Sequence, residues 1–318
     1  AADQARLLHG PAVLAPGQAL AWRIAKATGA DLMADFVTAH LARGQGRVPL
    51  TKVPYNVDLA QQTLAPYKHI ILVNAKPPVG FFAYPGKSST QYADDANLFV
   101  LSRPEQDAVA ALEALADELG APPCALPDPG PRPEAPSGAI TSEGVARAVA
   151  ALIPEASIVS DESISYGRGF YPETFAAPAH DWLHLGGGAI GDGLPVATGA
   201  AIGAGGQRRV ISLQADGSAM YSLQALWTQA REGLDVTTVV FANRTYQILK
   251  GEFAGVDAGE PGRKALDMLN IDNPALDWVS LAKGMGVQAQ SVTTAEDFSN
   301  ALTNSVREKG PRLIEVVM

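Results

Sequence analysis

The sequence predicts an α/β protein made of two Rossmann-like domains with parallel sheets. Two observations support this fold class. Short apolar runs such as HIILVNA (69–75) and VTTVVF (236–241) alternate with longer segments of helical periodicity, and a proline-rich stretch divides the chain. Strands that are apolar nearly throughout are typical of parallel sheets covered by helices on both faces. With 318 residues, the chain is long enough for two domains, each with its own core.

The clearest domain boundary is the stretch APPCALPDPGPRPEAP at residues 121–136, which contains seven prolines. Proline can continue neither a helix nor a central strand, so this stretch reads as a semi-rigid linker. We therefore predict a first α/β domain over residues 1–120, a linker over 121–137 and a second domain over 138–318.

Each predicted domain shows the alternation of strands and helices. In the first domain we expect helices over 17–29 and 104–120 and strands over 69–75 and 97–101. In the second domain a helix over 141–153 begins at Thr141 or Ser142, either of which can cap it, with Glu143 in its first turn. The further elements expected there are strands over 157–160, 208–217, 235–244 and 312–318, and helices over 221–233 and 276–284.

The helix expected over 221–233 is the crossover between two of these strands. Its apolar residues recur at helical spacing and predict one face packed on a sheet. That face comprises Leu223, Leu226, Trp227, Ala230 and Leu234. A right-handed crossover places the strands before and after it side by side in one sheet, pointing the same way.

Composition and charge exclude several classes of protein. The net charge of −9 argues against a nucleic-acid binder or a protein held on an anionic membrane, and no run of about 18 apolar residues offers a membrane span. The single cysteine, Cys124, cannot form an internal disulfide, so we expect a cytoplasmic protein. The chain begins AADQ without a methionine, which we interpret as a sign of removed or absent upstream sequence.

A glycine-rich turn, HLGGGAIGDGLP at 184–195, lies between a predicted strand and a predicted helix. Gly186, Gly188 and Gly191 satisfy G-x-G-x-x-G, a weak dinucleotide-binding signal when it stands alone. Asp216 follows Gly191 by 25 residues, close to the interval expected of an NAD-binding protein. That alternative leaves Gly217, Ser218 and Asn243 without a role.

Two polar residues follow neighbouring strands of the second domain. Asp216 and Asn243 each come directly after a predicted strand, and the carboxyl ends of parallel strands meet at one edge of a sheet. Carboxylate and amide oxygens together with phosphate oxygens are how Mg²⁺ is usually held, and the amides of Gly217 and Ser218 can face a phosphate. Taken singly, Asp216 could instead cap a helix and Asn243 could occupy a turn.

The segment ADGSAMYSLQALWTQAREGLDVTTVVFANRTY (215–246) resembles the thiamin diphosphate motif, which begins Gly-Asp-Gly and ends in Asn. The stretch GGGAIGDGLPVATGAAIGA (186–204) is similar to the sequence before that motif in acetolactate synthases and benzoylformate decarboxylases. HIILVNAKPPVGFFAYPGKSS (69–89) resembles the middle domain of acetolactate synthase-like proteins. Ala215 stands where the family commonly has glycine, and a small residue should fit there. The resemblance therefore implies a middle domain and a diphosphate-binding domain.

Carried onto this sequence, the resemblance implies a cofactor site in the second domain. It assigns Mg²⁺ to Asp216, the side chain of Asn243 and the backbone carbonyl of Thr245. It assigns the diphosphate to Gly217, Ser218, Ser165 and Ser163, the bend of the cofactor to Ile190, and its 4′-amino group to the carbonyl of Gly188. On their own, Ile190 would be a core residue and the two serines ordinary loop residues.

The resemblance also implies an activity. It is that of a thiamin diphosphate- and Mg²⁺-dependent enzyme acting on a 2-oxo acid, by carboligation of the acetolactate synthase type or by decarboxylation of the benzoylformate or pyruvate type. Residues 1–120 show no clear glycine-rich flavin turn, which argues against FAD. The reading that stays open beside these is a non-catalytic cofactor-binding subunit.

The family also has a pyrimidine-binding domain, which precedes the middle domain and for which we find no match in this sequence. Its activating glutamate matches no glutamate of the chain, so the catalytic group is expected elsewhere. We therefore expect the C-terminal portion of a larger or split enzyme, which functions as a homo-oligomer with a pyrimidine-binding domain as partner and without nucleic acid or membrane.

Overall fold

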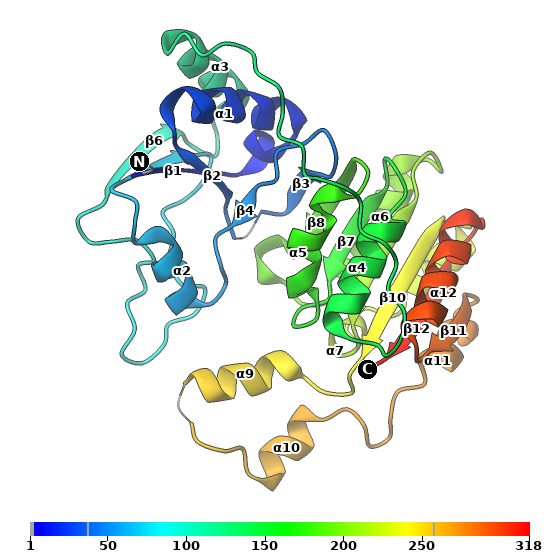
Figure 1. Ribbon diagram of the computed structural model, residues 1–318. Coiled ribbons are helices and arrows are strands. Elements are labelled where there is room, and N and C mark those ends of the chain that lie inside the picture. Colours follow the sequence, from blue (N-terminus) through cyan, green and yellow to red (C-terminus); the bar gives the residue numbers. More distant parts are fainter. Residues whose placement is uncertain (1–2, 37, 257) are drawn as a thin grey trace. The chain divides into compact units, whose positions relative to one another are not determined.

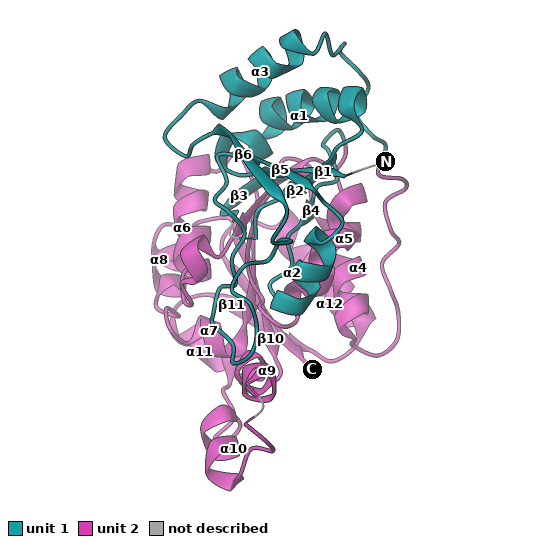
Figure 2. Ribbon diagram, turned by 90° about the vertical axis from the view of Figure 1, so that its left-hand side faces the viewer, with its two compact units in different colours: residues 1–42, 46–128 teal, residues 43–45, 129–318 magenta. Residues whose placement is uncertain are grey.

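The computed structural model describes residues 3–36, 38–256 and 258–318. The chain divides into two compact units, residues 1–42 with 46–128 and residues 43–45 with 129–318 (Figure 2). The main division, between residues 128 and 129, falls within the stretch expected as a linker. The assignment of residues 43–45 to unit 2 was not indicated by the sequence pattern.

Unit 1 contains a parallel sheet with the strand order β4-β2-β1-β5-β6 (Figure 1). Its strands are β1 (Gln4–Leu8), β2 (Asp31–Ala34), β4 (Thr51–Lys52), β5 (His69–Val73) and β6 (Asn97–Ser102). Its helices are η1 (Gly10–Val13), α1 (Ala15–Thr28), α2 (Val57–Leu64) and α3 (Ala108–Glu118). Asp107 caps α3 by accepting hydrogen bonds of 3.0 Å from Val109 and Ala110, so this helix begins later than expected.

Unit 2 is built on a second sheet, in which its strands run in the order β11-β12-β10-β9-β7-β8. These strands are β7 (Ile158–Glu162), β8 (His180–His184), β9 (Val210–Ala215), β10 (Val236–Ala242), β11 (Gln288–Val292) and β12 (Arg312–Val317), all paired in parallel. β3 (His40–Arg43) ends in Arg43, which belongs to unit 2. The two parallel sheets confirm the predicted fold class.

Helices cover both faces of this sheet, with α4 and α12 on one side and α6 and α8 on the other (Figure 2). Thr141 and Thr294 cap α4 and α12 through their hydroxyl oxygens. The helices are α4 (Ser142–Leu152), α5 (Phe170–Glu173), α6 (Gly193–Ala204), α7 (Asp216–Ala219), α8 (Ala225–Arg231), α9 (Gln247–Gly255), α10 (Arg263–Leu269), α11 (Trp278–Gly284) and α12 (Ala295–Arg307), with the short 3-10 turns η2 (Gly167–Gly169), η3 (Thr174–Ala176) and η4 (Gly186–Gly188). Within the described residues, no helix has both the length and the apolar character that crossing a membrane requires.

The crossover helix between β9 and β10 corrects one expectation. The helix over 221–233 is confined to α8, and Trp227 is 51 % exposed rather than buried on its inner face. Leu226 and Gln229 are the fully buried residues, and the Gln229 amide donates a hydrogen bond of 3.0 Å to the Thr198 hydroxyl of α6. The prediction placed every apolar residue on the inner face. In the structure, the polar residue Gln229 is buried there instead, with a buried hydrogen-bond partner.

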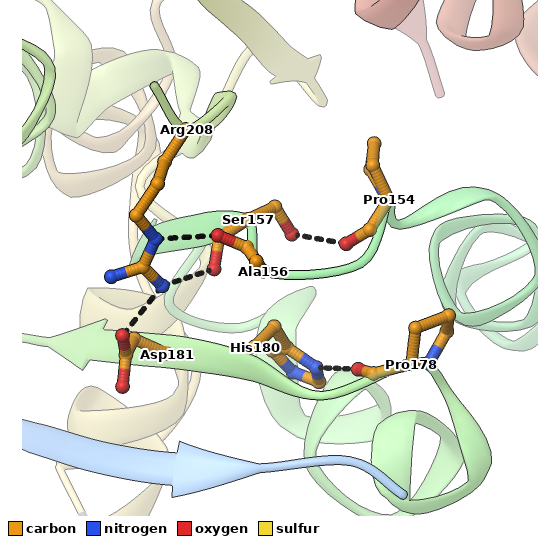
Figure 3. Close-up of polar contacts among 7 residues, drawn as sticks. All are labelled: Pro154, Ala156, Ser157, Pro178, His180, Asp181 and Arg208. Atoms are coloured by element: carbon orange, nitrogen blue, oxygen red, sulfur yellow. Dashed lines mark hydrogen bonds and ion pairs between the residues drawn. The ribbon is translucent and has the colours of Figure 1, made fainter. Parts of the chain in front are cut away.

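A network of polar contacts ties the amino ends of β7, β8 and β9 together (Figure 3). The guanidinium of Arg208 donates to the carbonyls of Ala156 and Ser157 and to the carboxylate of Asp181, the last over 2.6 Å. The Ser157 hydroxyl donates to the Pro154 carbonyl over 2.8 Å. These contacts fix the amino ends of the three strands relative to one another.

Candidate cofactor site

The carboxyl edge of the second sheet contains a topological switch point. The chain places β8 on one side of β7 and then places β9 and β10 on its other side. In open α/β sheets, ligands bind where the strand order reverses in this way, outside the carboxyl ends of the strands. The predicted site residues follow the strands that border this point: Ser163 and Ser165 after β7; Asp216, Gly217 and Ser218 after β9; Asn243 and Thr245 after β10.

Asp216 is a buried carboxylate at the end of β9, with only 2 % of its surface exposed. One oxygen accepts a hydrogen bond of 2.8 Å from the Gly217 N–H, and the other accepts one of 2.6 Å from the Arg244 N–H. Burial raises the pKa of Asp216 above its usual range, and these backbone hydrogen bonds work against that rise. Burial disfavours the ionised form of this carboxyl group, and a bound cation would stabilise that form.

The turn after β10 brings two more oxygen atoms to the same edge. The side-chain oxygen of Asn243 accepts a hydrogen bond of 3.1 Å from the Thr245 N–H, and the Thr245 carbonyl accepts one of 2.9 Å from Gln247. Arg244, between them, has a φ of +57°, which non-glycine residues rarely adopt. Its N–H thereby points to Asp216, so the turn joins the ends of β9 and β10.

These donors fit Mg²⁺ better than a transition metal. A carboxylate, an amide oxygen and a backbone carbonyl are hard oxygen ligands, and each can accept a further contact through its second lone pair. Among the described residues there is no group of three or more His, Cys, Asp or Glu side chains able to hold a metal ion. The donor set therefore suits a cation whose coordination is completed by phosphate oxygens and water.

Gly217 lies against an aromatic ring, which explains why glycine is required there. A Cβ atom at this position would lie 2.5 Å from Cε1 of Tyr246. The neighbouring Ser218 is buried, and both residues belong to α7. The backbone of this turn can therefore approach a ligand closely on its remaining side, as a diphosphate-binding turn must.

The loop after β7 contains the two predicted serines in different surroundings. The Ser163 hydroxyl is buried and donates to the carboxylate of Asp161, whereas Ser165 is half-buried. Ile164, between them, has a φ of +50°, a strained conformation for a β-branched residue of the kind that clusters at functional sites. Ser165 is therefore better placed than Ser163 to meet a ligand.

The glycine-rich turn is held by carboxylates of the chain itself. The Gly186 N–H donates to Asp192 over 3.0 Å, and the N–H groups of Gly191 and Gly193 both donate to Glu162. A dinucleotide would need the amides at the start of α6 for its pyrophosphate. Because Glu162 already occupies the Gly191 and Gly193 amides, the geometry argues against the NAD-binding alternative.

Ile190 and Gly188 lie between these fixed ends of the turn. Ile190 is 43 % exposed, so it is not the core residue that its apolar character alone suggested. The backbone is in the left-handed region at both Gly187, with a φ of +64°, and Gly188, with a φ of +73°. An exposed apolar side chain on a glycine-rich turn suits contact with a planar ligand.

Glu162 is the residue of this site that sequence reasoning missed. It is the last residue of β7, is 1 % exposed, and its burial is the main cause that raises its pKa to about 7. The available signal was an acidic residue at the end of a strand that borders the switch point. In the segment SDESIS (160–165), only Ser163 and Ser165 were predicted as site residues.

Comparison with known proteins shows which proteins the chain resembles. Residues 171–316 match the model of the thiamine pyrophosphate enzyme, C-terminal TPP binding domain. The chain is 46 % identical, over 98 % of its own length and 60 % of the relative's, to the "Putative acetolactate synthase large subunit IlvX" of Mycobacterium tuberculosis. It is 33 % identical, over 66 % of its length and 39 % of the relative's, to the benzoylformate decarboxylase of Pseudomonas aeruginosa.

Solved structures show the same relationship. The chain resembles the thiamine diphosphate-dependent 4-hydroxybenzoylformate decarboxylase of Rhodococcus jostii RHA1, with a TM-score of 0.79 and 26 % identity over 99 % of this chain and 61 % of that one. The fold also matches the benzoylformate decarboxylase of Polynucleobacter necessarius, with a TM-score of 0.77, 21 % identity, and 99 % of this chain and 61 % of that one covered. The chain thus spans about 60 % of the length of IlvX and of these two structures.

Proposed function

The chain carries a thiamine pyrophosphate-binding domain over residues 171–316, and from this premise we propose that it is part of an enzyme that acts on 2-oxo acids with thiamine diphosphate and Mg²⁺. The reaction we propose first is decarboxylation followed by carboligation, as in acetolactate synthases. The observation that carries the proposal is the meeting of Asp216 with the Asn243–Thr245 turn at the switch point of the second sheet.

Asp216, Asn243 and the carbonyl of Thr245 would hold the magnesium ion. Gly217 and Ser218, with Ser165 and Ser163 after the neighbouring strand β7, would bind the diphosphate. The buried carboxylate of Asp216 would offset part of the cation's charge, and the cation would screen the phosphate oxygens from that carboxylate. Cofactor binding would then depend on the metal.

The other end of the cofactor would lie against the glycine-rich turn. The Gly188 carbonyl would accept a hydrogen bond from the 4′-amino group, and the exposed Ile190 side chain would support the bend between the rings. When bound, thiamine diphosphate supplies the carbon that attacks the 2-oxo acid and the ring that accepts the electron pair left by carbon dioxide. The role of this chain is to bind and orient that cofactor.

The proposal includes a pyrimidine-binding domain from outside residues 1–318, and with it the glutamate that activates the cofactor. It also includes assembly as a homo-oligomer, because in the related family the site forms between domains of different subunits. We propose no role for FAD, nucleic acid or membranes, and we propose that the enzyme acts in the cytoplasm.

Simple decarboxylation is the second candidate. It is favoured by the similarity to two benzoylformate-type decarboxylases, one by sequence and one by structure at 26 % identity. Both candidates share the cofactor site, and they differ in whether a second carbonyl compound is joined to the fragment that remains.

Assay of the full-length protein against a panel of 2-oxo acids tests the proposal. With thiamine diphosphate and Mg²⁺ present, we expect carbon dioxide release from at least one acid, and a coupled product from pyruvate if carboligation occurs. Carbon dioxide without a coupled product would select the decarboxylase. Metal-dependent cofactor binding with no turnover would select a non-catalytic subunit, and a response to NAD(H) alone would overturn the proposal.

A further inference from the structure

Glu162 occupies a position in the cofactor site that the proposed function does not use. It ends β7, lies opposite Gln214 in the register with β9, and is 1 % exposed. A buried carboxylate costs free energy unless polar groups compensate it. The groups that compensate the Glu162 carboxylate therefore indicate its role.

The compensating groups are two backbone amides of the glycine-rich turn. The N–H groups of Gly191 and Gly193 donate to the two different oxygens of the Glu162 carboxylate, the second over 2.9 Å. The approach is close, because a Cβ atom at position 193 would lie 2.7 Å from Cβ of Glu162. The Glu162 side chain is thus hydrogen-bonded to the turn on both sides of Asp192.

Two further contacts fix the ends of the same turn. The carboxylate of Asp192 accepts the N–H of Gly186, and the Ser222 hydroxyl donates to the Gly191 carbonyl over 2.7 Å. Residues 187–190 lie between these anchors and include the exposed Ile190. From the sheet, Ser160 and Glu162 of β7 both reach the turn, and the Ser160 hydroxyl donates to the Gly193 carbonyl over 2.9 Å. The Glu162 carboxylate bonds to two amides of the turn, so it helps to set the height of the turn above the strand ends.

We propose that Glu162 is a positioning residue, whose carboxylate holds the glycine-rich turn (residues 186–193) in the shape that receives the aminopyrimidine ring of thiamine diphosphate. This inference rests on the proposed function for the identity of the ligand. That Glu162 holds the turn rests only on hydrogen bonds within the chain.

A carboxylate is suited to this role because both of its oxygens are acceptors. The amide of a glutamine has one acceptor oxygen and one NH₂ group, which is a donor. In Glu162→Gln this NH₂ group would face one of the two backbone N–H groups, and no hydrogen bond could form between two donors. Glu162→Gln therefore keeps the size of the side chain and releases one side of the turn. At pH 8, above the pKa of about 7 of Glu162, the group is charged. Hydrogen bonds to a charged group change an equilibrium constant by roughly ten- to a hundredfold, so the loss should be measurable at that pH.

The first experiment compares two ligands on the full-length protein. In Glu162→Gln we expect the dissociation constant for thiamine diphosphate with Mg²⁺ to rise about tenfold or more. The constant for inorganic diphosphate with Mg²⁺ should change less than about twofold. That ligand needs the turns near residues 216–218 and 243–245 and the loop with Ser163 and Ser165, whereas the Glu162 carboxylate bonds to Gly191 and Gly193 of the glycine-rich turn. A general loss of structure would weaken both ligands equally, which would contradict a positioning role.

A matched control is Glu315→Gln, which makes the same change at another buried glutamate of the same sheet, on β12. It should leave both dissociation constants close to those of the wild-type protein. An equal loss of thiamine diphosphate affinity in both variants would refute a role specific to Glu162.

Hydrogen exchange tests, without any cofactor, whether Glu162 holds the turn. Amides of residues 186–193 should exchange faster in Glu162→Gln than in the wild-type protein, while those of β9 and β10 keep their protection. Unchanged exchange in the turn would overturn the inference even if cofactor affinity fell. If the wild-type protein bound no thiamine diphosphate, the proposed function would fail, and the exchange result would still decide whether Glu162 holds the turn.

Discussion

The carboxylate of Asp216 accepts a hydrogen bond of 2.6 Å from the backbone N–H of Arg244, two residues beyond the end of β10. This contact joins the loops after two adjacent parallel strands. It also places Asn243 and Thr245 at the same edge as Asp216, which the spacing in the sequence could only suggest. The metal site that we propose depends on this contact.

Gly217→Ala should damage the site by steric conflict. The added methyl would lie 2.5 Å from the ring of Tyr246, so either the ring or α7 must move. We expect the free energy of unfolding to fall by about 1–3 kcal/mol, measured by urea denaturation, and cofactor affinity to fall with it. The double variant Gly217→Ala with Tyr246→Ala should recover part of that stability.

Gly203→Ala provides the matched control. This glycine lies in α6, and a methyl group there meets no atom within 4 Å. The substitution should stabilise the protein by about 0.5–1 kcal/mol and leave the affinity unchanged. A loss of stability at Gly203 as large as at Gly217 would show that the steric explanation is wrong.

Ile190→Ala should weaken cofactor binding with little effect on folding. The side chain is 43 % exposed, so its removal should change the free energy of unfolding by less than about 0.5 kcal/mol. Loss of its contact with the cofactor should raise the dissociation constant about tenfold, as measured by calorimetry. Ile202→Ala, at a residue 57 % exposed on α6, should affect neither quantity, and an identical effect at the two isoleucines would remove Ile190 from the site.

Stability should depend on pH through Glu162. Burial raises its pKa in the folded protein to about 7 from an ordinary 4.5, so between these values the folded state binds more protons than the unfolded state. Stability therefore falls as pH rises. Relative to Glu162→Gln, the wild-type protein keeps its full contribution below about pH 4.5 and loses on the order of 3 kcal/mol by about pH 7.

Urea denaturation of both proteins at pH values from 4 to 8 checks this dependence. The difference between the two free energies of unfolding isolates the glutamate, because the glutamine does not titrate. A constant difference, or one that favours the wild-type protein more at high pH, would show that Glu162 is not held in the buried state that the structure describes.

The fold class was predictable because it depends on patterns that the sequence shows directly. The apolar runs of β5, β9 and β10 and the caps of α4 are local signals, and the structure has these elements near the expected residues. β2 and β11 were missed because they are short or partly exposed and lack a continuous apolar run. α12 was not anticipated, although Thr294 caps an amphipathic helix there.

The candidate site divides in the same way. Asp216 and Asn243 could be predicted as site residues because each follows an apolar strand, and Gly217 because glycine there belongs to a motif. Glu162 was missed because its role depends on two amides that lie 29 and 31 residues away in the sequence. The burial of Gln229 likewise depends on a partner in another helix, which periodicity alone does not reveal.

The most direct test of the account is the affinity of the full-length protein for thiamine diphosphate with and without Mg²⁺, in the wild-type protein and in Asp216→Asn. The account predicts that Mg²⁺ tightens binding in the wild-type protein. It also predicts that Asp216→Asn loses at least about tenfold in affinity together with most of the metal dependence, because the charged ligand is gone. Equal affinities in the two proteins, with or without the metal, would contradict it.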